Sequence, residues 1–326
     1  MHDVVVIGSA TKDVFLDVKK IKPTKSDEFT TGQALCFGFG SKIAIDSMIF
    51  TSGGGGTNAA TTFARQGFKT ACVSVIGNDF NGQELLDELN RENIDTEYFQ
   101  KHDDDHTAYS VILVSEGGER TILSYKGEGQ HFDVDKIDFN LLDTKWLSLN
   151  SLGGHFDLFK KSIDWAVSRG ISVAMNPGTK ELALGLEVIK PLLKNCRIIS
   201  MDQEEAANLT GIPFSDERKL FNFMDEIIDG IFIMTKGPGG VSVSDGKNIY
   251  SAGIPDSPVI ERTGAGDAFF SGFVSEYIRS SDIPKAIQLG TANATAVVQH
   301  YGGKEGILRI GDTGKFDLVD VKVEIK

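Results

Sequence analysis

The sequence predicts an α/β protein in which helices cover a mainly parallel sheet, with a small second sheet inserted into this body. Short β-branched runs alternate with helical patterns along most of the 326 residues, as in parallel strands joined by crossover helices. Two stretches instead show strand patterns with no helix between them. Because no repeat, low-complexity segment or long linker interrupts the chain, we expect residues 1–326 to form a single domain.

The expected elements of the body follow from the spacing of apolar residues. The strands are short apolar runs at 4–7, 70–76, 145–149, 171–175, 197–201 and 230–234. The helices, with apolar residues at helical spacing, are expected at 58–66, 81–93, 157–169 and 203–209. At the end of the chain, residues 319–326 alternate between apolar and charged side chains, which is typical of an edge strand.

The inserted sheet is expected from two segments, at about residues 13–50 and 107–125. Both show alternating or flat strand patterns, and the second contains an expected turn at residues 116–118. We interpret the two segments as a lid over a cleft, because mobile segments placed on a rigid body commonly close over binding sites.

Composition excludes several classes of function. The chain has 33 basic and 46 acidic residues, a net charge of −13. Such a surface repels phosphate backbones and anionic lipids, so we expect no nucleic-acid or membrane partner and are left with small metabolites. The three cysteines form no C-x-x-C pair, which argues against a disulfide framework or a thiolate metal site. With no leader pattern and no apolar run of membrane-spanning length, we expect a cytoplasmic protein.

The most informative segment is Gly264-Ala265-Gly266-Asp267, which leads into a helical pattern at residues 271–279. Unpaired N–H groups converge at the positive end of a helix dipole, so the three small residues predict an anion hole. Asp267 would face the same cavity and act as a general base for a hydroxyl nucleophile during phosphoryl transfer. The residues alone leave a second interpretation open, in which Asp267 only caps the helix.

A run of four glycines, residues 53–56, precedes Asn58 and a helical pattern. Consecutive glycines destabilise regular structure, so their presence indicates that a ligand approaches the backbone closely. Asn58 carries both a donor and an acceptor and is suited to vicinal hydroxyls of a polyol. A helix cap behind a flexible turn is the alternative.

Two further segments lie where strands are expected to end, which is where open α/β sheets bind ligands. Residues 235–240 close one strand and open another, with a hydroxyl and several glycines, although a plain hairpin has the same pattern. Asp202, Glu204 and Glu205 begin a helix and could hold Mg²⁺, although acidic residues are also favoured in a first helical turn. The P-loop and dinucleotide-binding patterns are both missing from the sequence, so hydride transfer has no support.

Residues 262–269, Arg-Thr-Gly-Ala-Gly-Asp-Ala-Phe, resemble the D-T-x-G-A-G-D-x-F signature of the ribokinase-like (PfkB) carbohydrate kinase family. Other segments resemble the family in the same order. Residues 8–13 are similar to its G-x-x-x-x-D, 53–58 to its G-G-x-x-x-N, 202–205 to its N-x-x-E, and 235–237 to its T-x-G. The resemblance covers residues 3 to about 309.

The resemblance implies a three-layer α/β/α ribokinase-like body with a β lid, which transfers the γ-phosphoryl group of ATP to a primary hydroxyl. Asp267 would be the base, and the amides of Gly264, Ala265 and Gly266 the anion hole. The resemblance assigns the remaining site residues in three groups: Asp13, Gly54, Gly55 and Asn58 for the substrate, Thr235, Gly237, Gly240 and Asn293 for ATP, and Glu205 with Asp202 for Mg²⁺.

The chain departs from the family pattern at four positions. Asp202 stands where the family has Asn, which adds negative charge near the expected metal. Glu261 and Arg262 stand where relatives that bind a monovalent cation have Asp and Thr, and the arginine would displace such an ion. Gly55 stands where ribokinases carry a lysine, so the resemblance does not assign ribose as the substrate.

We therefore expect an ATP-dependent sugar kinase and keep two alternatives. One is a nucleoside kinase of the same family, and the other is a non-catalytic sugar or nucleotide sensor. The aromatic pair in Phe37-Gly38-Phe39-Gly40, on the expected lid, would stack on a nucleobase or join two lids in a homodimer. Core or interface packing is the explanation we favour for this pair.

Overall fold

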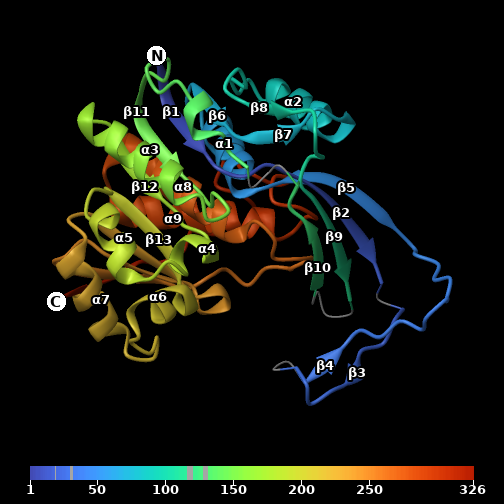
Figure 1. Ribbon diagram of the computed structural model, residues 1–326. Coiled ribbons are helices and arrows are strands. Elements are labelled where there is room, and N and C mark those ends of the chain that lie inside the picture. Colours follow the sequence, from blue (N-terminus) through green and yellow to red (C-terminus); the bar gives the residue numbers. More distant parts are fainter. Residues whose placement is uncertain (19, 30–31, 116–119, 128–130) are drawn as a thin grey trace.

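The computed structural model describes residues 1–18, 20–29, 32–115, 120–127 and 131–326 (Figure 1). Within these residues the largest sheet has nine strands in the order β17-β16-β15-β14-β13-β12-β11-β1-β6. Their bounds are β1 His2–Ile7, β6 Thr70–Val73, β11 Thr144–Leu149, β12 Ser172–Met175, β13 Ile198–Asp202, β14 Ile231–Thr235, β15 Val241–Ser244, β16 Asn248–Ala252 and β17 Lys322–Ile325.

The sheet is mainly parallel, as predicted. Strands β6, β1, β11, β12, β13 and β14 run parallel to their neighbours, whereas β14 to β17 pair antiparallel. The expected strand at 70–76 is divided in two, because Ser74 leaves the ladder and its hydroxyl donates to the carbonyl of Gly8 at 2.7 Å. The second half, β7 (Val75–Gly77), pairs with β8 (Gln100–His102) in a separate small sheet.

Helices cover both faces of the large sheet, which confirms the three-layer architecture. On β1, Val5 and Ile7 point into one core and Val4 and Val6 into the other, as alternation along a strand requires. The first core includes α3 (Phe156–Ser168), α5 (Leu186–Leu193), α6 (Gln203–Thr210) and α7 (Glu217–Ile227). The second includes α1 (Gly55–Arg65), α2 (Phe80–Arg91), α8 (Ala265–Ser280) and α9 (Ile283–Val297). Among the described residues, short helices are α4 (Thr179–Leu182), η3 (Val134–Lys136) and η4 (Gly237–Gly239).

Two helices begin earlier than their apolar patterns predict. Helix α8 starts at Ala265 rather than near residue 271, and α1 starts at Gly55, inside the glycine run. The reason for α1 is a close approach to the end of β1. The N–H of Gly56 donates to the Ser9 carbonyl at 3.1 Å, and a Cβ added at Gly56 would lie 2.5 Å from the carbonyl carbon of Gly8. Glycine is therefore required here by packing.

A second, four-stranded sheet has the order β10-β9-β2-β5. Strands β2 (Thr11–Asp17) and β5 (Met48–Gly53) come mostly from residues 13–50, and β9 (Tyr109–Val114) and β10 (Arg120–Tyr125) from residues 107–125. The turn expected at 116–118 lies outside the described residues. The small inserted sheet is thus present, and its action as a lid stays a prediction.

Between β2 and β5 the chain forms an extended arm, residues 18–47, which projects away from the body (Figure 1). It carries the short hairpin of β3 (Thr24–Lys25) and β4 (Gln33–Ala34). At the other side of the molecule, the expected edge strand near the end of the chain is β17, which pairs with β16. Within the described part of the chain, no helix combines the length and the apolar character needed to cross a membrane.

Candidate active site

The carboxylate of Asp267 lies beside Asn58, at the place where helices α8 and α1 begin. Asn58 Nδ2 donates to Asp267 Oδ2 at 2.9 Å, a contact between residues 209 positions apart. The other carboxylate oxygen, Oδ1, faces Gly55, where an added Cβ would lie 3.3 Å away. The fold therefore places this oxygen directly over glycine backbone. Asn58 is buried inside α1 and is not a helix cap, so that alternative is wrong.

The surroundings of Asp267 make it a stronger base than an ordinary aspartate. Burial by the surrounding protein raises the pKa of Asp267, and the hydrogen bond from Asn58 lowers it in part. A raised pKa increases the tendency of the carboxylate to accept a proton, which suits a general base that works near neutral pH.

The N-terminus of α8 has the geometry of an anion site. Gly264 is the N-cap with φ of 77°, and a Cβ added there would lie 2.4 Å from Gly303 Cα, so both conformation and packing require glycine. A Cβ at Gly266 would meet nothing within 4 Å, so open space lies in front of this residue. The N–H of Ala265 already donates to the Arg262 carbonyl at 3.3 Å. For the other N–H groups of its first turn the helix itself provides no acceptors, and these are left to an anion.

The glycine run packs against the acidic end of β2. A Cβ added at Gly53 would lie 2.0 Å from Asp13 Oδ2, and one at Gly54, whose φ is 97°, would lie 2.4 Å from the Ser9 carbonyl. Asp13 is 5% exposed. Burial raises the pKa of Asp13, while a hydrogen bond from Ser110 and the charge of Lys304 lower it. The structure thus brings the predicted substrate residues Asp13, Gly54, Gly55 and Asn58 together beside Asp267.

Several buried polar atoms in this region have no partner among the residues that the structure describes. Buried polar groups are normally hydrogen-bonded, so such a group indicates a place where a ligand is expected. One of them, Asn150 Oδ1, was missed by the sequence analysis. Asn150 follows β11, and its Cβ is 3.5 Å from a Cβ added at Gly55. The feature of the sequence that could have identified Asn150 is its place at the carboxyl end of a parallel strand, where such sheets bind ligands. The other unpartnered atoms near the site are Asn58 Oδ1, Thr51 Oγ1 and Thr263 Oγ1.

Asp202 and Glu205 form a capping box at the start of α6. Asp202 Oδ1 accepts the N–H groups of Glu204 at 2.9 Å and Glu205 at 2.8 Å, and Glu205 Oε2 accepts the N–H of Asp202 at 2.9 Å. Burial raises the pKa of Glu205. Among the described residues no cluster of three or more His, Cys, Asp or Glu side chains gathers as in a protein-only metal site. The pair fits an ion that is held mainly by water and a nucleotide's phosphates.

The predicted nucleotide segment lies next to this pair. Thr235 ends β14 and stands in register with Asp202 of the neighbouring β13. A Cβ at Gly237, whose φ is 52°, would meet nothing within 4 Å. A Cβ at Gly240, whose φ is 84°, would lie 2.1 Å from the Ala252 carbonyl, so this glycine is required by β16. The segment that the resemblance assigned to the metal and the segment that it assigned to the nucleotide are therefore adjacent, at the carboxyl ends of β13 and β14.

Asn293, which the resemblance assigned to ATP, lies in the interior of α9 and has no exposed surface. Its Nδ2 donates to the Ala268 carbonyl at 2.8 Å, and its Oδ1 accepts the N–H of Leu308 at 2.9 Å. The side chain thus holds α8 and the segment after α9 together. Asn293 therefore exposes no polar atom to a ligand in this structure, and its assignment to ATP stays a prediction.

Glu261 stands where relatives that bind a monovalent cation have Asp, and its side chain bonds to the backbone. It is 1% exposed, and its two carboxylate oxygens accept the N–H groups of Thr263 at 2.6 Å and Gly302 at 3.0 Å. Each oxygen of Glu261 thus already accepts one backbone hydrogen bond. For the aromatic pair Phe37 and Phe39, we favoured core or interface packing. Core packing is wrong, because both side chains are exposed on the arm.

Comparison with known proteins agrees with this geometry. Residues 1–309 match the model of the pfkB family of carbohydrate kinases. The ribokinase of Haemophilus influenzae is 28% identical over 319 residues, which cover 95% of this chain and 97% of that protein. A nucleoside kinase of Methanothermobacter thermautotrophicus is 24% identical over 84% of this chain and 87% of that protein.

The solved structure of Arabidopsis thaliana ribokinase complexed with ribose and ATP shares the fold, with a TM-score of 0.76 at 20% identity over 94% of this chain and 96% of that one. The family match extends from β1 through α9 and includes both glycine-marked helix starts. The chain therefore belongs to the pfkB family of carbohydrate kinases and is a phosphotransferase with an alcohol group as acceptor.

Proposed function

We propose that this protein is an ATP-dependent sugar kinase that phosphorylates a primary hydroxyl group. The observation that carries the proposal is the contact of Asn58 with Asp267 at the start of two helices, beside glycine backbone. A carboxylate with a raised pKa next to open helix N–H groups provides a base and an anion site in one place.

The acceptor is held by polar side-chain atoms that line the space beside Asp267. Asn58 Oδ1 and Asn150 Oδ1 are buried acceptors without a partner there, and Asp13 supplies a carboxylate at the same site. Hydroxyl groups of a polyol donate to all three. This acceptor-rich lining favours a sugar.

In the reaction, the carboxylate of Asp267 acts as the base and the start of α8 binds the transferred phosphoryl group. Its Oδ1 accepts the proton of the sugar hydroxyl as that oxygen attacks the terminal phosphorus of ATP, while the bond from this phosphorus to the bridging oxygen breaks and ADP leaves. The N–H groups of Gly264 and Gly266 at the start of α8 stabilise the charge on the transferred phosphoryl oxygens, whereas the Ala265 N–H donates to the Arg262 carbonyl at 3.3 Å. Glycine at 266 leaves space for close approach of the phosphate to the backbone.

For the donor we infer a position along Thr235, Gly237 and Gly240, next to Asp202 and Glu205. The Arabidopsis relative, whose structure is named as a complex with ribose and ATP, supports ATP. Mg²⁺, when bound with the nucleotide, neutralises phosphate charge, and Asp202 and Glu205 would hold it through water. Because both oxygens of Glu261 are occupied by N–H groups, we propose no monovalent cation.

A nucleoside kinase is the second candidate, since a relative of this chain is named a nucleoside kinase. The aromatic pair Phe37 and Phe39 is exposed on the arm and by itself does not distinguish a nucleobase from a free sugar. The sugar proposal therefore remains the one that the site favours.

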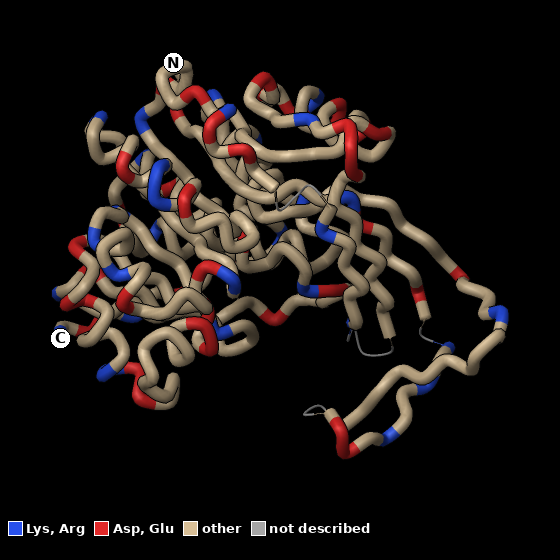
Figure 2. The backbone as a smooth tube through the Cα atoms, in the orientation of Figure 1, with Lys and Arg blue, Asp and Glu red and all other residues tan. Residues whose placement is uncertain are grey.

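The arm gives a reason to propose a homodimer. Residues 18–47 contain five lysines and three acidic residues and so carry a charge of +2 (Figure 2). Because the whole chain carries −13, the rest of it carries −15. The arm exposes Phe29, Phe37 and Phe39, and such a patch is costly in water. A second copy of this acidic chain offers charge complementary to the basic arm. We therefore propose that the arm and the lid pack on a second copy.

Changing Asp267 to Asn removes the base but keeps the shape and the contact with Asn58. We expect kcat to fall by about 10²–10⁴, the range for a positioned general base, with ATP affinity nearly unchanged. Coupled ADP release gives kcat, and calorimetry gives ATP binding. Asp164→Asn, an exposed aspartate of α3, is the control. An unchanged kcat would remove the mechanism.

The pH profile tests the environment of Asp267. Because the pKa of Asp267 is raised, kcat should fall with decreasing pH at a higher pH than an ordinary aspartate would produce. The Asn58 hydrogen bond lowers this pKa, so Asn58→Ala should move the acidic limb of kcat further upward. A limb that stays in place, or moves downward, contradicts the assignment of the base.

A coupled ADP-release screen over pentoses, hexoses and nucleosides identifies the acceptor. We expect a free sugar to have the highest kcat/KM, since the lining offers hydroxyl acceptors. Nucleosides ahead of all sugars would make the second candidate correct. Calorimetric binding of sugar and ATP without any ADP release would show a sensor.

The oligomeric state tests the role of the arm. We expect the wild-type chain to have the mass of a dimer in light scattering after size exclusion, and Phe37→Ser with Phe39→Ser to give a monomer. Phe80→Ser on α2, which removes a similarly exposed phenylalanine elsewhere, should stay dimeric. A monomeric wild type at micromolar concentration would rule this interface out.

A further inference from the structure

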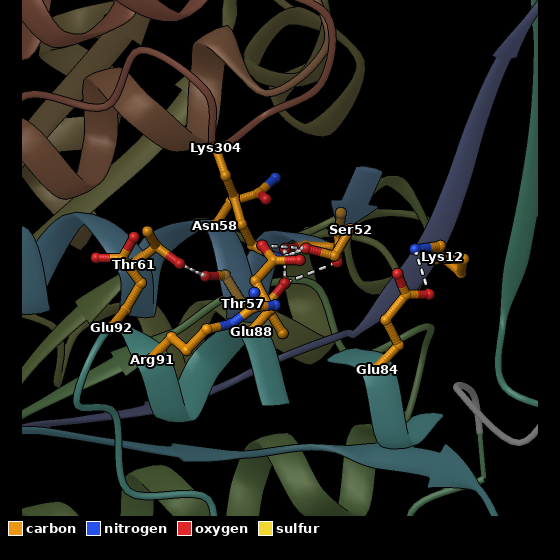
Figure 3. Close-up of polar contacts among 12 residues, drawn as sticks. Lys12, Ser52, Thr57, Asn58, Thr61, Glu84, Glu88, Arg91, Glu92 and Lys304 are labelled. Atoms are coloured by element: carbon orange, nitrogen blue, oxygen red, sulfur yellow. Dashed lines mark hydrogen bonds and ion pairs between the residues drawn. The ribbon is translucent and has the colours of Figure 1, made fainter. Parts of the chain in front are cut away.

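Thr51 carries a buried hydroxyl group that has no partner among the residues that the structure describes. It is a partly buried residue of β5, and its Oγ1 makes no hydrogen bond there. Threonines close by on α1 bond to the backbone: Thr57 Oγ1 donates to the Gly53 carbonyl at 2.7 Å, and Thr61 Oγ1 to the Thr57 carbonyl at 2.9 Å (Figure 3). Because buried hydroxyl groups are normally paired, Thr51 indicates a place where a ligand group is expected.

The strand register places Thr51 directly opposite Asp13. Asp13 on β2 pairs with Thr51 on β5 in an antiparallel ladder. Side chains of opposite residues lie on the same face of a sheet, with Cβ atoms about 4.5–5.5 Å apart. The same face carries Ser110 of β9, which pairs with Asp13 on its other side and donates a hydrogen bond to its carboxylate. Thr51 therefore lies on the face of the inserted sheet that carries a proposed substrate residue.

The main chain that Thr51 contacts does not pair with its hydroxyl group. Thr51 packs on Gly302, where φ is 84° and an added Cβ would lie 2.8 Å from Thr51 Oγ1. The N–H of Gly302 is already used, because it donates to Glu261 Oε1 at 3.0 Å. The next residue, Gly303, packs on Asn58, since a Cβ added there would lie 2.5 Å from Asn58 Nδ2. Thr51 and Asn58 thus lie against consecutive residues, beside the acceptor site.

Thr51 adds a hydrogen-bond donor to a lining that otherwise offers acceptors. The side-chain amides of Asn58 and Asn150 are both engaged. Asn58 Nδ2 donates to Asp267, and the amide of the second asparagine donates to Ser148 Oγ at 3.3 Å. A sugar hydroxyl that donates to a carboxylate or an amide oxygen keeps lone pairs that need a donor. A threonine O–H provides one, and its branched side chain is stiff at χ1, so the group is held in place.

We propose that Thr51 is a specificity-determining residue, whose Oγ1 donates a hydrogen bond to the sugar hydroxyl that itself donates to Asp13. The proposal rests on the function proposed above and adds a residue to its acceptor site. Between side chains whose Cβ atoms are about 5 Å apart, one hydroxyl oxygen can lie about 2.5–3.0 Å from both polar groups. The pair therefore recognises one hydroxyl as both donor and acceptor, and discriminates against a sugar that lacks it.

The alternative is that Thr51 only packs the inserted sheet on Gly302. The next residue of the strand offers a matched control. Ser52 also carries a hydroxyl group, but it points to the opposite face, where it donates to Glu88 Oε1 at 2.6 Å and contacts Lys304 Nζ (Figure 3). Ser52→Ala removes a hydroxyl group and its contacts from the same strand without changing the face that carries the acceptor site.

The first measurement compares Thr51→Val, Thr51→Ser and Ser52→Ala, with the pentose or hexose that has the highest kcat/KM in the screen. Thr51→Val keeps the shape but loses the hydroxyl group, so we expect the KM of the sugar to rise about tenfold, as for a buried group left without a partner. Both kcat and the KM of ATP should stay within about twofold, because ground-state binding of the sugar is what is lost.

The two other variants separate the hydroxyl group from packing. Thr51→Ser keeps the hydroxyl group, and Ser52→Ala changes the opposite face, so both should keep the KM of the sugar within about threefold. An unchanged KM in Thr51→Val, or a rise in Ser52→Ala as large as in Thr51→Val, would overturn the proposal.

Deoxy sugars identify the hydroxyl involved. We expect one monodeoxy analogue of that sugar to have the same KM with the wild type and Thr51→Val, because the group that Thr51 serves is gone. The same analogue should remove the difference between the wild type and Asp13→Asn. Thr51→Ala gives the same comparison if the valine variant does not fold. A difference that persists with every monodeoxy analogue, or that disappears at another position for Asp13→Asn, would overturn the proposal.

Failure of the proposed function is recognised separately. If the protein binds a sugar without turnover, calorimetric Kd values replace KM for the same variants and analogues. If nucleosides are the acceptors, 2′-deoxy and 3′-deoxy nucleosides take the place of the deoxy sugars. Equal affinity of the wild type and Thr51→Val for the unmodified ligand would overturn the role of Thr51 whatever the fate of the kinase assignment.

Discussion

The active site depends on one close contact, in which the starts of helices α1 and α8 meet across glycine backbone. Gly303 lies between them, since a Cβ on it would strike Asn58 and a Cβ on Gly264 would strike Gly303 itself. Only this approach brings Asn58 within hydrogen-bond distance of Asp267, across the large separation of the two residues in the sequence. The base, the anion site and the acceptor side chains all take their positions from it.

The same compact arrangement explains the electrostatics of the site. Asp13, Glu205 and Asp267 all have raised pKa values because the protein removes water from around them. For Asp267 this strengthens a base, whereas for Asp13 the same burial weakens an acceptor of hydroxyl hydrogen bonds. The hydrogen bond from Ser110 and the charge of Lys304 lower the pKa of Asp13 in part, although burial is the larger effect.

The sequence predicts the parallel sheet, the inserted strands and the glycine-marked helix starts, because these leave local patterns. It does not reveal what depends on contacts between distant residues. Asn293 fits a family position yet lies in the core, where Ala268 and Leu308 use its polar atoms. Asn150 and Lys304 carry no local pattern, and only the folded chain shows their place beside Gly55 and Ser52. Gly53 and Gly56 looked like ligand contacts but are required by packing against Asp13 and Gly8.

The most direct test of the central claim is a crystal structure of the protein with its best sugar acceptor and a non-hydrolysable ATP analogue. We expect the reacting hydroxyl oxygen to lie about 2.6–3.2 Å from Asp267 Oδ1. We also expect the terminal phosphate to contact the N–H groups at the start of α8. A sugar hydroxyl bound elsewhere, with the phosphate away from α8, would contradict it.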